Sequence, residues 1–172
     1  VELIIGKATT IDREAKTVYL ESGEAVGYEK LIMTTGSTPL VPPIPGADLD
    51  NVFTIQKDVS YLDHLLDVLK DANDVVVVGG GFIGLEMADE CRKLGNKNIT
   101  VVEMLSHCLF VVFDEDVCVR TEEMLENAGV NLRLSQRVTR LAGNGSVEYV
   151  ELADGERIKA DVVILGIGVQ PN

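Results

Sequence analysis

The chain has 172 residues, of which 46% are hydrophobic and 25% charged, and its formal net charge is −13. That length fits one globular domain, or one domain with a fragment of a second. The excess of 28 acidic over 15 basic residues argues against nucleic acid and against an anionic membrane surface as partners, because both need clustered Lys and Arg.

Residues 1–35 are predicted to be β-rich. The run VELIIGKATTID breaks into polar residues, KTVYLESGE alternates before a turn at Ser22 and Gly23, and YEKLIMTTGSTP reads as an apolar strand that ends at Gly36. Short strands separated by glycine turns are typical of an antiparallel meander.

Four prolines follow within seven residues, at positions 39, 42, 43 and 45. Because proline lacks an N–H donor and fixes φ, neither a helix nor a central strand continues through this segment. We predict a linker or domain boundary near residues 38–50, with residues 1–45 in one part and residues 46–172 in the other.

A helix is predicted for DVSYLDHLLDVLKDA, with Asp58 as its N-cap. His64 is expected to be a surface or partly buried residue beside the apolar face. That face would comprise Val59, Leu62, Leu65, Leu66 and Leu69.

From Asp74 onward, strands and helices alternate. DVVVV has no polar alternation, which indicates burial on both faces in a parallel sheet. The next segments are a helix ending at Gly95, the strand NITVVE, a helix capped by Asp114 or Asp116 and closed by Gly129, and the strand VNLRLS. The segments RVTRLAG, SVEYVELADG and ERIKA would form an antiparallel meander before the last apolar strand, in DVVILGIGVQPN. We therefore expect an α/β fold: a Rossmann-like, doubly wound parallel sheet with helices on both faces and a β-meander crossover.

The loop GGGFIG carries the pattern G-x-G-x-x-G between a strand and a helix. Gly79 permits the tight turn, Gly81 lets a pyrophosphate touch the backbone, and Gly84 lets the helix pack closely on the strand. The positive end of the helix dipole then faces the phosphates. The pattern, including the intervening Gly80, predicts a dinucleotide site.

Glu103 ends the second strand about twenty residues past this loop, where a carboxylate can bind the adenosine ribose hydroxyls. It would repel a 2′-phosphate by about 4 kcal/mol if the charges were ~4 Å apart at an effective dielectric of ~20. The following residues, MLSHC, offer no Arg or Lys for such a phosphate. NAD(H) is therefore predicted over NADP(H), and a solvated acid at the strand end is the alternative interpretation of Glu103.

Two further residues near these motifs have open interpretations. Glu86 lies one turn into the helix, where an acid often serves only as a dipole partner. His107 is a candidate to approach the ribose or adenine.

The three cysteines, Cys91, Cys108 and Cys118, form no C-x-x-C pair. Cys91 is expected to be a small core residue, and we predict no metal site. Unpaired cysteines fit a reducing compartment such as the cytoplasm. No apolar run reaches the ~18 residues of a membrane span. No signal peptide is recognised and Val1 is not an initiator Met, so the sequence reads as an excised piece or a processed chain.

Three motifs, YEKLIMTTGSTPLVPPIPG, VVVVGGGFIGLEMADE and LGIGVQPN, resemble the pyridine nucleotide-disulfide oxidoreductases. The resemblance covers essentially the whole chain and is greatest to the NADH oxidase and coenzyme A-disulfide reductase branch, with NADH-dependent rubredoxin and ferredoxin reductases nearby. It implies an FAD-binding half interrupted by an NAD domain and followed by a dimerisation domain. Residues 1–45 would be the end of the first FAD segment, and residues 46–172 the NAD(H)-binding domain of a homodimer.

The resemblance also implies roles for individual residues. Phe82 would shield the flavin until nicotinamide displaces it, Ile83 would line the nicotinamide site, and Glu86 would pair with a flavin-side lysine. The others are Ile167 and Gly168, reaching the nicotinamide through backbone groups, and Thr35 and Gly36, approaching FAD.

In two respects the chain differs from the family pattern. Thr34 stands where the family usually has Ala. In the disulfide-reducing members the redox cysteine belongs to an earlier segment, so no sulfur chemistry is assigned to this chain.

The sequence thus favours the NAD(H)-binding domain of a flavin-dependent NADH oxidoreductase, which positions nicotinamide for hydride transfer to FAD. Alone, this chain would bind NADH without turning it over. The alternative is a stand-alone NAD-binding or NAD-sensing module without redox chemistry. A flavin-free dehydrogenase is a third hypothesis, without a Tyr-x-x-x-Lys motif to support it. The electron acceptor stays open among oxygen, peroxide, coenzyme A disulfide, persulfide and a small iron protein.

Overall fold

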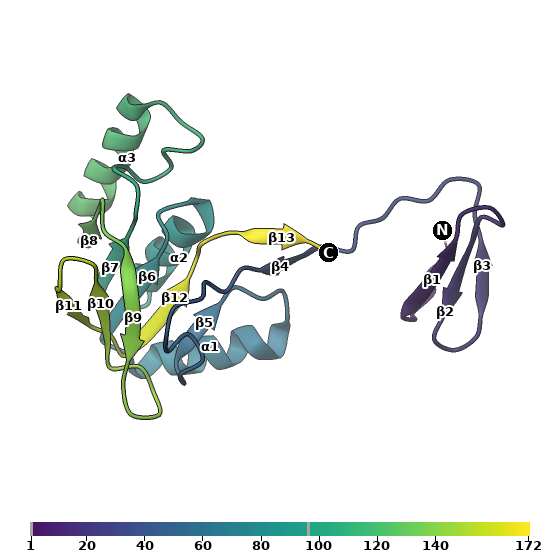
Figure 1. The fold of residues 1–172 in the computed structure, drawn as a ribbon, viewed down its shortest axis with the longest axis horizontal. Coiled ribbons are helices and arrows are strands. Elements are labelled where there is room, and N and C mark those ends of the chain that lie inside the picture. Colours follow the sequence, from purple (N-terminus) through teal and green to yellow (C-terminus); the bar gives the residue numbers. More distant parts are fainter. Residues whose placement is uncertain (1, 96) are drawn as a thin grey trace. The chain divides into compact units, whose positions relative to one another are not determined.

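The computed structural model describes residues 2–95 and 97–172, which divide into two compact units (Figure 1). The first unit extends to Gly36 and the second spans Ser37–Asn172. Val1, which opens the predicted β-rich segment, and Asn96 lie outside the described residues.

The first unit is an antiparallel sheet in the order β1-β2-β3, which confirms the predicted meander. Its strands are β1 (Ala8–Asp12), β2 (Thr17–Leu20) and β3 (Ala25–Gly27). The turn between β1 and β2 is stabilised by the Asp12 side chain, which accepts hydrogen bonds from the N–H groups of Glu14 and Ala15 at 2.9 and 2.8 Å.

The apolar strand predicted in YEKLIMTTGSTP is wrong. Residues 31–36 form no strand, and the side chains of Ile32 and Met33 are 85% and 62% exposed. An apolar strand needs a sheet that is covered on both faces. The small meander does not provide one, because none of residues 2–36 is buried.

The second unit is built on a five-stranded parallel sheet in the order β5-β12-β6-β7-β8. Its strands are β5 (Val52–Thr54), β6 (Asp74–Val78), β7 (Asn98–Val102), β8 (Val130–Arg133) and β12 (Val162–Leu165). The central strand β6 pairs on both sides, which explains its uninterrupted valines. The chain runs outward from β6 to β8 and then crosses to β12, so the strand order reverses between β6 and β12.

Three helices cover one face of this sheet: α1 (Val59–Asp71), α2 (Phe82–Lys93) and α3 (Glu115–Asn127). Leu65 of α1 and Ala88 of α2 lie in one core cluster with Val75 and Val77 of β6, and Leu125 of α3 packs against its edge. The alternate β6 residues point to the opposite face, as the strand period of two requires.

That opposite face is covered by the antiparallel meander β11-β10-β9, which the sequence predicted. Its strands are β9 (Val138–Ala142), β10 (Tyr149–Leu152) and β11 (Arg157–Lys159). Val150 and Leu152 form a second core cluster with Val76 and Val163. The fold class is therefore confirmed, but the expected helices on both faces are corrected: the meander supplies one of the two apolar covers.

The apolar face of α1 also needs a correction. Asp58 caps the helix as predicted, accepting the Tyr61 N–H at 2.9 Å. Leu65 and Leu69 are buried, but Val59 and Leu66 are 76% and 47% exposed. The buried stripe runs instead through Tyr61, Leu62, Leu65, Val68 and Leu69. His64 is exposed, as expected, with its ring centroid 5.6 Å from that of Phe53.

The other helix ends follow the predicted signals. Gly95 and Gly129 follow α2 and α3 at φ 122° and 87°, in the left-handed region that favours glycine. Asp114 occupies the N-cap position of α3 without a side-chain cap hydrogen bond. Asp116 lies inside the first turn and is not the cap.

The proline-rich segment belongs to the second unit. β4 (Ser37–Pro39) pairs with β13 (Val169–Pro171). The Leu141 N–H donates to the Pro45 carbonyl at 2.9 Å, and Ile44 packs against the meander-side core. The compact division thus falls before the prolines, whereas the assignment of residues 1–45 and 46–172 to FAD and NAD domains stays a prediction.

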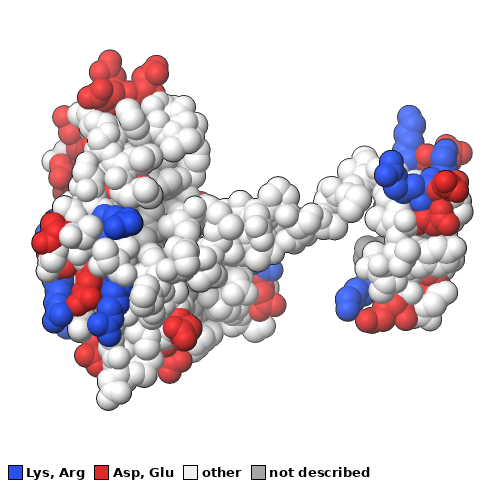
Figure 2. Space-filling view, viewed as in Figure 1, with Lys and Arg blue, Asp and Glu red and all other residues white. Residues whose placement is uncertain are grey.

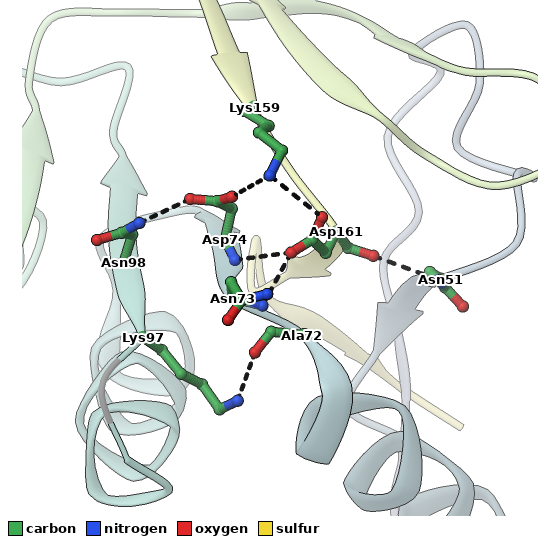
Figure 3. Close-up of polar contacts among 8 residues, drawn as sticks. All are labelled: Asn51, Ala72, Asn73, Asp74, Lys97, Asn98, Lys159 and Asp161. Carbon is green, nitrogen blue, oxygen red and sulfur yellow. Dashed lines mark hydrogen bonds and ion pairs between the residues drawn. The ribbon is translucent and has the colours of Figure 1, made fainter.

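A polar cluster closes the amino ends of β6 and β12 (Figure 3). An Asp161 carboxylate oxygen accepts the N–H groups of Asn73 and Asp74 at 2.8 and 3.0 Å. The Lys159 ammonium lies 2.7 Å from the Asp74 carboxylate and 3.8 Å from that of Asp161. Hydrogen bonds from Lys159 and Asn98 lower the pKa of Asp74. This edge of the sheet is therefore occupied by structural contacts.

Charges are distributed over the surface of the second unit. Figure 2 shows acidic side chains gathered at one end of α3 and both signs mixed over the meander, with no extended basic face in that view. Within the described residues, none of the helices is both long and apolar enough to cross a membrane.

Candidate functional site

A cavity of ≈ 950 Å³ lies at the carboxyl ends of the central strands. Gly79 after β6, Glu103 after β7 and Gly166 after β12 all line it. In open α/β sheets, ligands bind outside the carboxyl ends of the strands, where the strand order reverses. The volume is that of a site for a small molecule or cofactor.

Most of the residues predicted for the nucleotide meet at this cavity. Five of the predicted residues do not line it. Gly80 belongs to the glycine loop, and Gly84 and the exposed Glu86 belong to α2. Thr35 and Gly36 belong to the first unit. The predicted residues that line the cavity are Gly79, Gly81, Phe82, Ile83, Glu103, Ile167 and Gly168.

Two glycines of the loop are required by the protein itself. Gly79 has φ 108°, and a Cβ there would lie 2.7 Å from the Gly166 carbonyl oxygen. A Cβ on Gly84 would collide with the Gly79 carbonyl oxygen. These contacts account for the tight turn and for the close approach of α2 to β6.

Gly81 is different, because nothing in the protein requires it to be glycine. Its φ is −80°, which any residue adopts, and no atom lies within 4 Å of a Cβ built there. Gly81 nevertheless lines the cavity. A side chain at this position would project into the cavity. It would occupy the space that a ligand needs in order to lie against the backbone.

The amino end of α2 is open to an anion. Gly81 is its N-cap and supplies no side-chain cap hydrogen bond, whereas Asp58 caps α1 with its carboxylate. The first N–H groups of a helix have no partner within the helix and carry the positive end of its dipole. This end of α2 at the cavity is therefore suited to phosphate groups.

Glu103 lines the cavity and also holds the glycine loop. Its side chain is buried, so the interpretation as a solvated acid is wrong. One carboxylate oxygen accepts the Gly80 N–H at 2.6 Å and the other accepts the Leu105 N–H at 2.8 Å. A carboxylate has about four lone-pair sites, so two remain for hydroxyl groups of a ligand.

His107 lies outside the cavity lining and faces α3 instead. Its Nδ1 is 3.1 Å from a Glu122 carboxylate oxygen, and its Nε2 is 3.6 Å from Glu115. The other oxygen of the buried Glu122 accepts the Cys108 N–H at 2.7 Å. His107 and Glu122 therefore attach to α3 the segment Met104–Phe113, which we call the β7–α3 loop.

The cavity includes residues that the sequence analysis missed. Met104, Leu105 and Val111 come from the β7–α3 loop, residues 136–139 from the turn after β8 and the start of β9, and residues 42–44 from the proline-rich segment. The first two groups follow the carboxyl ends of neighbouring parallel strands, and this rule could have indicated them. No local signal places residues 42–44 there.

The cysteines provide no further reactive group at the site. All three are free and buried, which confirms the expectation that Cys91 is a core residue. Burial raises the pKa of the Cys91 thiol to about 11 and that of Cys108 to about 12. Among the described residues, no group of three or more His, Cys, Asp or Glu side chains is arranged to hold a metal ion.

Comparisons with known proteins agree with this geometry. A family model described as pyridine nucleotide-disulphide oxidoreductase matches residues 1–172. An NADH oxidase of Enterococcus faecalis is 38% identical over 160 residues, which are 92% of this chain and 35% of that protein. The chain thus spans about a third of the length of this curated relative.

Solved structures of other proteins have a similar fold. A ferredoxin reductase from Rhodopseudomonas palustris has a TM-score of 0.89 at 32% identity, over 100% of this chain and 42% of that one. A water-forming NADH oxidase from Lactobacillus brevis, bound to NADH, has a TM-score of 0.80 at 29% identity, over 96% of this chain and 37% of that one.

Proposed function

Since the chain belongs to the pyridine nucleotide-disulphide oxidoreductase family, we propose that its second unit binds NAD(H) in the cavity at the carboxyl ends of β6, β7 and β12. The observation that carries the proposal is Gly81. The protein leaves open space where its Cβ would be, beside an uncapped helix end. The family relationship and the NADH-bound structural neighbour support the same ligand.

Each part of the cavity has a role in this proposal. The Gly81 backbone and the amino end of α2 hold the pyrophosphate. Glu103 accepts hydrogen bonds from the adenosine ribose with its remaining lone pairs, and its charge disfavours a 2′-phosphate. Ile83, Ile167 and Gly168 form the wall at the nicotinamide end. Bound NADH would supply a hydride, and the protein orients the nicotinamide and limits the access of water.

In the whole protein, we propose that this unit serves a flavin-dependent NADH oxidoreductase. Thr35 and Gly36 are proposed to approach FAD, and Phe82 and Glu86 to lie on the flavin side of the nicotinamide. The relatives are named NADH oxidase and ferredoxin reductase, which supports a small molecule or a small redox protein as electron acceptor. A homodimer in the cytoplasm completes the proposal.

The first test is a titration of the chain with NADH and NADPH, followed by nicotinamide fluorescence. The chain has no Trp to transfer energy to the nicotinamide. We expect saturable NADH binding and binding of NADPH at least tenfold weaker. Absence of NADH binding, or equal affinity for both nucleotides, would contradict the proposal.

An absorbance spectrum of the purified chain tests the flavin part separately. We expect substoichiometric FAD or none, because the sequence contains no second glycine fingerprint for the FAD pyrophosphate. Stoichiometric bound flavin would show that this chain itself forms the flavin site. NADH binding without any flavin dependence in the whole protein would favour an NAD-sensing module.

A further inference from the structure

The β7–α3 loop connects the two ends of the cavity. It begins directly after Glu103, and its residues Met104, Leu105 and Val111 line the cavity. It ends at Phe113, the residue before the N-cap of α3. The Phe113 ring packs edge-to-face on the ring of Phe82, with centroids 5.8 Å apart and planes at 78°. The loop therefore extends from the ribose-binding acid to the aromatic side chain beside the glycine loop.

Backbone hydrogen bonds hold this loop in place. The Leu109 N–H donates to the Gly80 carbonyl at 2.9 Å, and the Phe113 N–H donates to the Leu109 carbonyl at 3.1 Å. Leu109 has φ 60°, a left-handed conformation that a non-glycine residue adopts only where neighbouring contacts hold it. Together with the Cys108–Glu122 hydrogen bond, these contacts fix the backbone of the loop at Phe113 beside the glycine loop.

Phe82 itself has little other support. It is the first residue of α2, it lines the cavity, and its side chain is 56% exposed. Among the ring contacts of the described residues, Phe82 takes part only in the one with Phe113. An exposed phenyl ring at a helix start has several accessible rotamers, so an aromatic neighbour decides which one it occupies.

We propose that Phe113 is a positioning residue for Phe82: by holding the Phe82 ring, it preorganises the nicotinamide end of the cavity. The inference rests on the proposed NAD(H) function and adds to it a second residue, contributed by the loop that starts at the adenosine end. Without Phe113, the Phe82 ring also samples rotamers that occupy the nicotinamide end of the cavity, and the nicotinamide must then displace it. Preorganisation of this kind affects only ligands that reach the ring.

The test compares two ligands, NADH and ADP-ribose, which lacks the nicotinamide. Their dissociation constants are measured by calorimetry for the wild-type chain and for Phe113→Leu, Phe113→Tyr and Phe82→Ala. Phe113 is 40% exposed, so its replacement by Leu should be tolerated, and thermal unfolding checks that the variants fold. The matched control is Phe110→Leu, since Phe110 lies in the same loop at 44% exposure but contacts His107 instead.

We expect Phe113→Leu to weaken NADH binding by about two- to tenfold, as follows from the worth of one aromatic pair, and to leave ADP-ribose binding unchanged. The quantity compared is the ratio of the NADH and ADP-ribose dissociation constants. Phe113→Tyr should keep this ratio at its wild-type value, and Phe110→Leu should not alter it. In the Phe82→Ala background, Phe113→Leu should have no further effect on the ratio, because the two residues act as one unit.

Other outcomes separate the two proposals. If the wild-type chain binds both ligands and Phe113→Leu weakens both equally, or neither, the positioning role is wrong while the proposed function stands. The same conclusion follows if Phe113→Leu changes the ratio as much without Phe82 as with it. If the wild-type chain binds neither NADH nor ADP-ribose, the proposed function itself is wrong and the inference falls with it.

Discussion

The carboxylate of Glu103 accepts a hydrogen bond from the backbone N–H of Gly80 at 2.6 Å. The acid at the end of β7 is thus attached to the glycine loop at the end of β6 by a contact within the protein itself. Glu103 therefore has two functions, one in the fold and one in the proposed choice of nucleotide, and substitutions should separate them.

Glu103→Gln tests both functions. An amide offers one acceptor oxygen, so either the Gly80 or the Leu105 N–H loses its partner, and the free energy of unfolding should fall by about 1–3 kcal/mol. The lost charge should also reduce the preference for NADH over NADPH by about tenfold, or ~1.4 kcal/mol. Urea unfolding measures the first effect, and the ratio of the two dissociation constants measures the second.

The control for this experiment is Glu90→Gln, which removes the same charge from an exposed position of α2. It should change neither stability nor nucleotide preference appreciably. If Glu90→Gln relaxes the preference as much as Glu103→Gln, net charge rather than a local contact determines the nucleotide.

Gly81→Ala should mainly lower NADH affinity, whereas Gly84→Ala should mainly lower stability. At position 81 the added methyl meets nothing within 4 Å, so stability should change by less than about 1 kcal/mol, while NADH affinity falls at least tenfold. At position 84 the methyl collides with the Gly79 carbonyl, and stability should fall by about 1–3 kcal/mol or more. Thermal unfolding combined with NADH titration distinguishes them. A Gly81→Ala variant that binds NADH normally would contradict the assignment of the pyrophosphate to this position.

The sequence predicted those elements whose signals are local. The valines of β6, the glycines after α2 and α3 and the Asp58 cap each depend on neighbouring residues, and all are confirmed. The predicted strand around Ile32 failed because an apolar run forms a strand only where a sheet covers it. The sequence also could not show that the meander covers the second face of the sheet. The apolar residues on a strand face do not specify which element buries them.

The site residues, too, could be predicted only where their signals are local in the sequence. Gly81 and Glu103 were predicted from a spacing within one strand–helix–strand unit, and both line the cavity. Pro42 and Ile44 reach the cavity from about forty residues earlier in the chain, through tertiary contacts that no spacing encodes. His107 looked suitable by its position after Glu103, but the buried Glu122, fifteen residues later, draws it to α3.

The ion pair of Asp74 and Lys159 predicts a specific dependence of stability on pH. Hydrogen bonding to Lys159 lowers the folded-state pKa of Asp74 below its ordinary value near 3.8. The stabilisation is therefore complete above the unfolded pKa and is lost as pH falls through the folded one. Lys159 behaves in the opposite sense. Its folded pKa is raised above 10.5 by Asp74, so its contribution is complete below that pH and is lost as pH rises through the folded value.

Asp74→Asn should reduce the difference in the free energy of unfolding between pH 7 and pH 3, measured by urea titration at both values. The control is Asp67→Asn, because Asp67 also pairs with a lysine, Lys70, at 2.7 Å. The Asp67 side chain is 71% exposed, against 17% for Asp74, and exposed pairs contribute little. Equal changes in the two variants would show that burial of the Asp74 carboxylate is unimportant.

The boundary between the two units can be tested by truncation. A chain that starts at Ser37 keeps β4, the residues 42–44 that line the cavity, and the hydrogen bond from the Leu141 N–H to the Pro45 carbonyl. Because the second unit has its own core clusters, we expect this truncated chain to fold and to bind NADH within about twofold of the starting chain. A chain that starts at Gly46 loses Ile44, which packs against the meander-side core. It should be less stable by about 2–4 kcal/mol and bind NADH more weakly. Thermal unfolding and NADH titration of both truncations decide between a boundary before the prolines and one after them, since equal behaviour of the two would place it after Pro45.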